Sequence, residues 1–391
     1  MNRLKIYILA FASFLLGTSE NMIAGVLDKI SDSLGTTLAA TGQLITIYAI
    51  VYAIGTPILM AVTARMDRRK LIMYGLTVFV IGNLLAIVYP SYGMLVASRI
   101  ITPLGAGVVM VTAMVVAAKL APAGKQAGAI ATVIMGFTGA LILGVPIGRV
   151  ITDVLNWQSA FGGIALLGLI SMAVIYPTIS GLEGDKPVPL LKQLALFKNL
   201  KVSLGLAISF FWLGGYSIVF AYLSPYLLNV SGISENLIST AFFIFGIASL
   251  FGSKLGGFST DRWGAPVTLT VGMILQIIML ILLSLVTNTL IGVLTILALW
   301  SLFTWSSGPS QQFLISTLEP ESSAVLSGLN QSMLQLAMAA GAGIGGIVVA
   351  KVSISVVPWI GALGIAIAIP VILIVSSLLS KNKMSESHLN Q

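Results

Sequence analysis

The sequence predicts an all-α membrane protein whose twelve transmembrane helices form two six-helix, pseudo-symmetric halves. Three observations lead to this fold class. The composition is too apolar for a water-soluble surface, apolar stretches of membrane-spanning length recur along the whole chain, and the second half repeats features of the first half at one fixed offset.

The composition indicates that lipid is the solvent around most of the chain. Of its 391 residues, 57% are hydrophobic and 8% are charged, whereas about 25% of the residues of a soluble domain are charged. The mean hydropathy is +1.04 over the full length. The length alone would suit two soluble domains, but a composition this apolar favours a membrane protein.

Cysteine and histidine usage excludes several kinds of chemistry. The chain has no cysteine and a single histidine, His388, close to its end. A disulfide framework, a histidine-built metal site and a Ser-His-Asp triad are therefore not expected. Gln126 follows Gly124 and Lys125 where a phosphate-binding loop needs Ser or Thr, so we expect no nucleotide hydrolysis. We predict no metal and no cofactor.

Twelve apolar stretches are long enough to cross about 30 Å of hydrocarbon. They cover residues 6–27, 42–63, 71–89, 94–117, 127–150, 159–178, 203–224, 237–258, 266–286, 291–314, 324–349 and 357–379. The first stretch lacks a small-residue cleavage site and leads directly into further spans. It is therefore predicted to be a retained helix and not a signal peptide.

The distribution of basic residues predicts the topology. An even number of spans places both termini on one side, and Lys and Arg concentrate on the cytoplasmic side of membrane proteins. With cytoplasmic termini, sixteen basic residues lie inside and three lie outside, namely Lys29, Arg149 and Lys351. The net charge of +8 thus indicates orientation, and we expect no nucleic-acid partner.

A polar stretch at residues 180–201 divides the chain at its midpoint. Its glycines, prolines and lysines are typical of a connecting segment. We therefore predict an N-terminal six-helix half at 1–179, a cytoplasmic linker at 180–201, a C-terminal six-helix half at 202–380 and a cytoplasmic tail at 381–391.

The two halves match at an offset of 197 residues. The matched positions are Leu16-Gly17 with Leu213-Gly214, Arg65 with Arg262, Gly144 with Gly341 and Gly148 with Gly345. Each pair falls at an equivalent place in its half, without a gap. A duplicated six-helix unit is the parallel-repeat architecture of one large class of transporters.

The loop after the eighth span carries the pattern G-x-x-x-D-R-x-G over residues 257–264. It resembles the loop signature of the major facilitator superfamily, whose first copy is degenerate here because Ala64 replaces the Asp and Asp67 replaces the second Gly. A glycine there allows close helix approach, and the Asp can sit at a helix N-terminus and pair with arginine. The alternative is a purely topogenic basic loop. The candidate conformational latch comprises Arg65, Asp67, Arg68, Arg69, Gly257, Asp261, Arg262 and Gly264.

The fifth span is rich in glycine and ends at an arginine. Its residues Gly136, Gly144, Pro146, Gly148 and Arg149 are similar to the superfamily's antiporter signature, although Val145 separates Gly144 from Pro146. Small residues permit close packing of membrane helices, and a proline kinks them. The resemblance implies a proton-coupled exporter, and the alternative is ordinary packing.

The resemblance extends end to end, to the twelve-helix drug:proton antiporter family and its bacterial exporters of purines and nucleosides, arabinose-type sugars and drugs. Its most distinctive pieces are residues 17–20, 221–226 and 309–312. It implies the major facilitator fold, a monomer in the bacterial cytoplasmic (inner) membrane, a small-molecule substrate, and protons as the coupling ion.

Glu20 is the clearest candidate for a functional residue in the sequence. It lies about 20 Å along the first helix from Ile6, within an apolar span. A carboxylate there costs several kcal/mol unless it is protonated, paired or hydrated, so it can bind and release a proton. The alternatives are a substrate anchor and a structural group near the outer mouth. Arg99, near the start of the fourth span, resembles the family's proton-transfer arginine or else snorkels to the interface.

A midplane site between two halves needs a few polar groups among aromatic and apolar walls. The mid-span candidates for this substrate cavity are Gln43, Tyr48, Tyr52, Trp212, Tyr216, Trp300, Trp305, Asn330, Gln331 and Gln335. Packing or helix–helix hydrogen bonding is the alternative for each. We expect proton-coupled efflux of a small solute such as a drug, purine, nucleoside or sugar. An uncoupled facilitator or uptake permease is the alternative, and the residue types argue against an enzyme or a channel.

Overall fold

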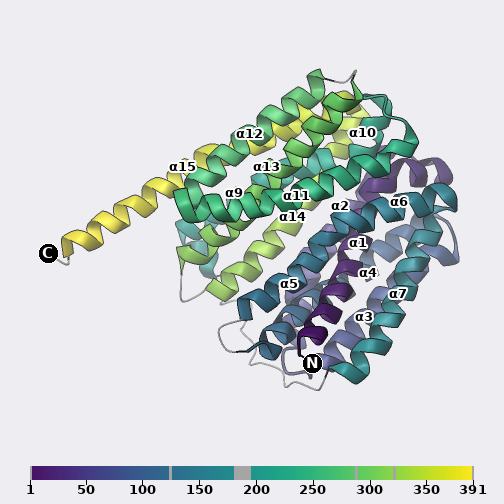
Figure 1. The fold of residues 1–391 in the computed structure, drawn as a ribbon, viewed down its shortest axis with the longest axis horizontal. Coiled ribbons are helices and arrows are strands. Elements are labelled where there is room, and N and C mark those ends of the chain that lie inside the picture. Colours follow the sequence, from purple (N-terminus) through teal and green to yellow (C-terminus); the bar gives the residue numbers. More distant parts are fainter. Residues whose placement is uncertain (1, 123–125, 180–194, 287–288, 320–322, 390–391) are drawn as a thin grey trace. The chain divides into compact units, whose positions relative to one another are not determined.

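The computed structural model describes residues 2–122, 126–179, 195–286, 289–319 and 323–389, and this part of the chain is helical (Figure 1). Its long helices are α1 (Asn2–Leu34), α2 (Leu38–Val62), α3 (Arg68–Val88), α4 (Tyr92–Leu120), α5 (Gln126–Gly139), α6 (Val145–Val154), α7 (Trp157–Thr178), α9 (Leu200–Phe220), α11 (Glu235–Trp263), α12 (Ala265–Leu285), α13 (Leu290–Leu318), α14 (Ser323–Lys351) and α15 (Val357–Leu389). The shorter elements are η1 (Ala140–Gly144), η2 (Leu196–Lys198), α10 (Leu223–Asn229) and η4 (Ile354–Val356).

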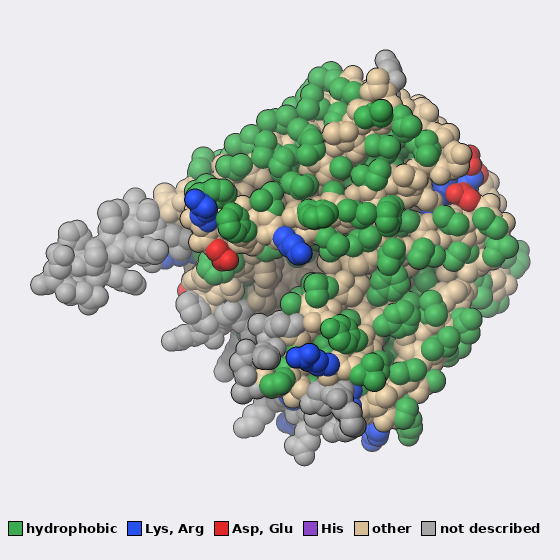
Figure 2. All heavy atoms as spheres, in the orientation of Figure 1, with side chains coloured by type: hydrophobic (Ala, Val, Ile, Leu, Met, Phe, Trp, Pro, Cys, Tyr) green, Lys and Arg blue, Asp and Glu red, His purple; other side chains and the backbone are tan. Residues whose placement is uncertain are grey.

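Twelve helical segments in the described residues are long and apolar enough to cross a membrane. They correspond one to one with the twelve predicted stretches, so the predicted fold class is confirmed. In Figure 2, hydrophobic side chains cover most of the visible face and charged side chains are few. α1 continues to Leu34, beyond the predicted end at residue 27, because the polar residues of its last turns ended the apolar window without ending the helix.

Short polar side chains mark where several helices begin. Thr37 Oγ1 accepts a hydrogen bond from Ala40 N (3.1 Å) at the start of α2, and Asn156 Oδ1 accepts one from Ser159 N (2.8 Å) at the start of α7. These contacts satisfy N–H groups that have no partner within the helix. Gly264 has φ +83° between α11 and α12, a conformation that glycine adopts without strain.

Three spans depart from a regular α-helix. α1 is kinked at Val26, whose φ/ψ is not helical. The fifth span contains the π-helical segment η1 between α5 and α6, two residues before Pro146 and in place of a simple kink. The seventh predicted span, 203–224, differs from the structure because α9 ends at Phe220 and α10 begins at Leu223. Pro225 has no N–H to donate to the carbonyl of residue 221, which explains the break.

The chain forms two compact units. Unit 1 contains Met1–Val188 together with Ala221–Gly246, and unit 2 contains Pro189–Phe220 together with Ile247–Gln391. Residues 180–194 of the predicted linker lie outside the described residues, and the predicted tail continues the helix α15 as far as Leu389. The boundaries of the two predicted six-helix halves stay a prediction.

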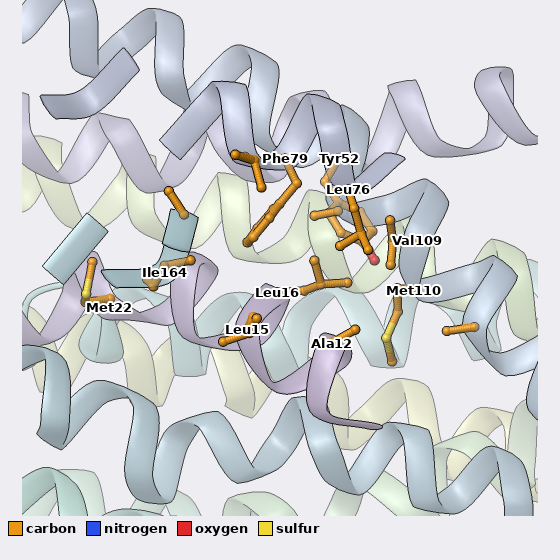
Figure 3. Packing of buried hydrophobic residues seen from close by; sticks show 14 of the residues in the cluster. Ala12, Leu15, Leu16, Met22, Tyr52, Leu76, Phe79, Val109, Met110 and Ile164 are labelled. Atoms are coloured by element: carbon orange, nitrogen blue, oxygen red, sulfur yellow. The ribbon is translucent and has the colours of Figure 1, made fainter. Parts of the chain in front are cut away.

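The core of unit 1 is formed by apolar side chains from α1 to α5 and from α7. Figure 3 shows Leu16 of α1, Tyr52 of α2, Leu76 of α3 and Val109 of α4 directed toward one another. Because each helix also presents apolar side chains to lipid, close fit and not hydropathy distinguishes the faces that pack together.

Glycines allow α1 to pack closely against the fifth span. A Cβ at Gly136 would overlap the carbonyl oxygen of Ala10, and a Cβ at Gly144 would overlap the hydroxyl of Thr18. Unit 2 repeats this arrangement, since a Cβ at Gly341 of α14 would overlap the carbonyl oxygen of Gly214 of α9. The glycines matched at the 197-residue offset therefore lie at equivalent helix pairs.

Candidate functional site

Glu20 lies in the middle of α1 and is 8% exposed. Its carboxyl interacts electrostatically with the guanidinium of Arg99 and with the phenols of Tyr48 and Tyr52. The neighbouring Ser19 donates a hydrogen bond to Asn83 Oδ1 (2.8 Å), and Asn83 in turn donates to the carbonyl of Phe79 (2.8 Å). This segment of α1 is thus anchored to α3 by polar contacts within an apolar span.

Arg99 is fully buried two turns inside α4. Arg99 Nη1 donates to the carbonyl oxygen of Ser19 (2.9 Å), and its guanidinium lies over the rings of Phe161 (4.9 Å) and Tyr48 (5.5 Å). Arg99 does not snorkel to the interface, because its side chain is fully buried and its guanidinium is bound within the protein to the Ser19 carbonyl. Sequence reasoning missed Asn83 and Phe161, although Asn83 is itself an amide within an apolar span.

The predicted site residues of α2 separate into two environments. Tyr48 and Tyr52 are buried, with ring centroids 6.3 Å apart, beside the Glu20 carboxyl. Gln43 is only partly buried, near the start of the same helix. Glu20, Arg99, Tyr48 and Tyr52 therefore form one cluster, which we call the Glu20 cluster. It combines an acid, a fixed cation and two phenols.

Replacing Arg99 tests whether the Glu20 cluster is an energetic unit. We expect Arg99→Leu to destabilise the protein by about 3–5 kcal/mol, because removing one partner of a buried charge pair leaves the other uncompensated. In a Glu20→Gln background, the same change should cost clearly less. Thermal unfolding in detergent, followed by tryptophan fluorescence, measures both. Equal losses in the two backgrounds would show that the two charges are not coupled.

The aromatic candidates of unit 2 lie on α9 and α13. The ring of Tyr216 stacks on that of Phe220 (5.0 Å) and contacts those of Trp300 (5.6 Å) and Trp305 (6.4 Å). The ring of Trp212 approaches Gly308, one turn beyond Trp305. Four of the predicted cavity residues thus lie along two facing stretches of helix.

The predicted amides of α14 lie in different places. Asn330 is buried, accepts a hydrogen bond from Ser209 of α9 (2.6 Å) and donates one to Gln312 Oε1 of α13 (3.1 Å). Gln311 Nε2 extends this network to Ser209 (2.7 Å). Gln331 is exposed, whereas Gln335 is buried. The structure therefore separates Asn330, in a polar network that joins three helices, from Gln331, its neighbour along the chain.

The predicted latch residues have mixed environments. Asp67 caps α3, with Oδ1 accepting from Lys70 N (3.0 Å). Arg68 is buried and donates to the Ala64 carbonyl (3.1 Å), and Arg69 lies over the ring of Tyr176 (5.0 Å). Arg65 is exposed. Asp67, which stands where the motif has its second glycine, thus caps the N-terminus of α3, while the position of the motif's acidic residue is Ala64.

The second copy of the latch motif departs from the expectation. Asp261 lies in the last turns of α11 and not at a helix N-terminus, and Arg262 lies over the ring of Trp263 (5.8 Å). A Cβ at Gly257 would meet no atom within 4 Å, whereas one at Gly256 would overlap the carbonyl of Ser306. Close helix approach in this part of α11 therefore depends on Gly256, one residue before the motif glycine.

Arg149 differs most from its predicted surroundings. It was expected outside the membrane at the end of the fifth span, but it is fully buried in α6. Arg149 Nη1 donates to Asp28 Oδ1 (2.6 Å) and to the carbonyl of Gly25 (3.1 Å). Gly148, one residue earlier, packs against Met22. Sequence reasoning missed Asp28 because it follows the last residue of the predicted first span.

Comparison with known proteins identifies relatives over nearly the whole chain. Residues 9–342 match the family described as Major Facilitator Superfamily. The chain is 61% identical over 390 residues to the MFS-type transporter YbcL of Bacillus subtilis (strain 168), with both chains fully covered. It is 29% identical over 363 residues to the inner membrane transport protein YdhP of Escherichia coli (strain K12), covering 92% of this chain and 93% of that one.

A solved structure supports the fold. The crystal structure of a bacterial homologue of the human lysosomal transporter Spinster matches with a TM-score of 0.72, covering 96% of this chain and 95% of that chain. At 17% sequence identity, this likeness concerns the arrangement of the helices alone.

Proposed function

Because the chain belongs to the major facilitator superfamily and is a multi-pass membrane transporter of a small solute, we propose that it exchanges that solute for protons and exports it. That the protein is a multi-pass membrane transporter of a small solute follows from its family. The proton coupling, the direction and the solute class are the proposal. The solute we expect is a drug, a purine or nucleoside, or a sugar.

The observation that carries the proposal is the Glu20 cluster. Burying a carboxyl and a guanidinium within membrane-spanning helices costs free energy. Ionisable side chains at such places therefore usually mark proton, ion or substrate pathways. Glu20 can hold a proton in one state and release it in another, while Arg99, fixed by the Ser19 carbonyl and two rings, stabilises the deprotonated form. Proton loss on one side and proton gain on the other would link solute movement to the proton gradient.

The distribution of buried charge favours separate roles for the two units. The buried charged side chains among the described residues are Glu20, Asp28, Arg68, Arg99 and Arg149, all of which belong to unit 1. The buried polar side chains of unit 2 are hydroxyls and amides, beside the aromatic residues of α9 and α13. We therefore assign proton exchange to unit 1 and contacts with an uncharged part of the solute to unit 2.

The proposal also includes the oligomeric state, the membrane, the orientation of the termini and the energy source. The protein would act as a monomer in a bacterial cytoplasmic membrane, with both termini in the cytoplasm and the proton gradient as its energy source. The bacterial relatives and the excess of basic residues in the predicted cytoplasmic loops support this setting. Its partners would be the solute, protons and the lipid bilayer, with no nucleic acid.

Proton flux in reconstituted liposomes tests the proposal. A pH-sensitive dye is trapped inside, a pH gradient is imposed, and purines, nucleosides, sugars and cationic dyes are added in turn. We expect one solute class to dissipate the gradient in liposomes that contain the protein and not in empty ones. Solute movement without proton movement would instead establish the uncoupled facilitator.

A further inference from the structure

We propose that a network of polar contacts with a buried centre at Asp28 and Arg149 is the outer gate of the transporter, which must break before the region around Glu20 can open to the outside. The network comprises Asp28, Lys29, Arg149, Asp153, Ser224 and Glu235, and is called the Asp28 network below. This inference rests on the proposed exchange of solute and protons, in which Glu20 gains a proton on one side of the membrane and loses it on the other. It adds a set of residues that belong neither to the Glu20 cluster nor to the aromatic residues of α9 and α13.

The centre of the network is a three-way contact between α1, α6 and α10. Arg149 Nη1 donates to Asp28 Oδ1 (2.6 Å) and to Ser224 Oγ (3.4 Å), while Ser224 Oγ itself donates to Asp28 Oδ1 (2.8 Å). The side chain of Arg149 is fully buried and that of Asp28 is 11% exposed. Hydrogen bonds to charged groups at such depth are stronger than those at a surface.

A second contact joins the same region to α11. Lys29 forms an ion pair with Glu235 at the start of α11 and another with Asp153 of α6 (3.5 Å). Asp153 also accepts from Arg149 Nε (3.2 Å). Since the Glu235 side chain is 64% exposed, this pair contributes less than the buried one, but it extends the network to a further helix.

Close backbone approach reinforces both contacts. A Cβ at Gly42 of α2 would overlap the phenol of Tyr222, directly before α10. A Cβ at Gly246 of α11 would overlap the backbone of Ile142 in η1. The segment Ala221–Gly246 is therefore held by ionic contacts and by packing that admits no larger side chain.

The path of the chain explains why these contacts act as a gate. Ala221–Gly246 belongs to unit 1, but α10 follows α9 of unit 2 after two residues, and α11 continues through Gly246 into unit 2 as one helix. In this proposal the segment Ala221–Gly246 follows the unit 2 helices to which it is joined at both ends, so the contacts with Asp28, Lys29 and Gly42 must break during transport. By the predicted topology, these ends of α1 and α6 face the outside.

Accessibility of a single introduced cysteine tests the gate, because the natural chain has none. The reporter is Ala24→Cys, at a site that is 2% exposed and lies four residues from both Glu20 and Asp28, just before the kink at Val26. Its labelling by a membrane-impermeant maleimide, added from outside, measures opening of the outer side. A second reporter, Leu155→Cys, is placed at an exposed site just beyond α6 and reports orientation and folding.

The test variants remove only the partners contributed by α10 and α11. Ser224→Ala with Glu235→Gln leaves the pair of Asp28 and Arg149 in place. We expect labelling at the reporter to rise at least roughly tenfold, as the loss of the short hydrogen bond from Ser224 to the Asp28 carboxylate alone implies. The matched control is Thr152→Ala with Asp32→Asn. It removes a hydroxyl that bonds only within α6 and an exposed carboxylate near the end of α1.

A steric variant provides an independent test. Gly246→Leu should force α11 away from η1 and raise labelling at least as much, whereas Gly163→Leu on α7, where a Cβ would meet no atom within 4 Å, should not. Equal labelling in test and control variants would overturn the gate. So would labelling of Leu155→Cys from the inside only, since the network would then face the cytoplasm.

The measurement is independent of the proposed proton coupling. It uses neither solute nor a pH gradient. The labelling can therefore contradict the gate while solute-dependent proton flux is observed, and it can support the gate while no such flux is found. Labelling in the test variants that exceeds the control, together with full labelling of the Leu155→Cys reporter from outside, would establish the outer gate.

Discussion

Glu20→Gln should reduce solute-dependent proton flux to the background of protein-free liposomes. Glutamine has nearly the same size and can occupy the same space, but its amide neither binds nor releases a proton near neutral pH. Burial no longer carries the cost of a charged carboxylate, so we expect the variant to fold. The flux assay with a trapped pH dye measures the loss.

Two further measurements separate the possible roles of Glu20. Solute binding, followed by the change in tryptophan fluorescence, should persist in Glu20→Gln if the residue carries the proton, and should be lost if it anchors the solute. The matched control is Glu319→Gln, at the C-terminal end of α13, where the carboxylate accepts a hydrogen bond from Asn199 (2.6 Å). Unchanged proton flux in Glu20→Gln would contradict the coupling role.

Gly136→Val should prevent stable packing of the N-terminal helices. A Cβ at this position would overlap the carbonyl oxygen of Ala10, and backbone atoms cannot move aside as a flexible side chain can. We expect a loss of about 3 kcal/mol, at the upper end of overpacking effects, and a fall in the unfolding temperature on the order of 5–10 °C. Size-exclusion chromatography in detergent and thermal unfolding measure the two effects.

Gly163→Val is the matched control for this substitution. Gly163 also lies within a membrane-spanning helix, but a Cβ there would meet no atom within 4 Å. Since valine is a somewhat better helix former than glycine, the control should retain the wild-type unfolding temperature or slightly exceed it. A similar loss in both variants would show that the close approach of α1 and α5 is not what requires glycine at position 136.

The positions of the spans could be predicted because they depend on local properties. Crossing a membrane requires about 20 apolar residues in succession, and each helix satisfies its own backbone hydrogen bonds. Glu20 could be identified for the same reason, since a carboxyl within such a run is anomalous wherever the helix packs. The helix ends were less accurate, because Asp28 and Lys29 end the apolar run but not the helix α1.

The packing faces of the helices could not be predicted, because nearly every face of a membrane-spanning helix is apolar. Hydropathy therefore does not indicate that Asn330 faces Ser209 while Gln331 is exposed, although a rotation of about 100° separates them. It also does not distinguish Gly256 from Gly257. Such differences depend on which neighbouring helix approaches, and that is a property of the folded chain.

The apolar pattern of the chain alone was therefore enough to establish a twelve-helix membrane protein with an unusual acid at position 20, because insertion into lipid acts on each segment separately. The partners of that acid and the Asp28 network emerged only from the fold. Asp28 meets Arg149 across 121 residues and Ser224 across 196, and no local pattern encodes such a pairing. Within the membrane, the contact between two helices is decided by the fit of their surfaces and by hydrogen bonds that neither helix can form alone.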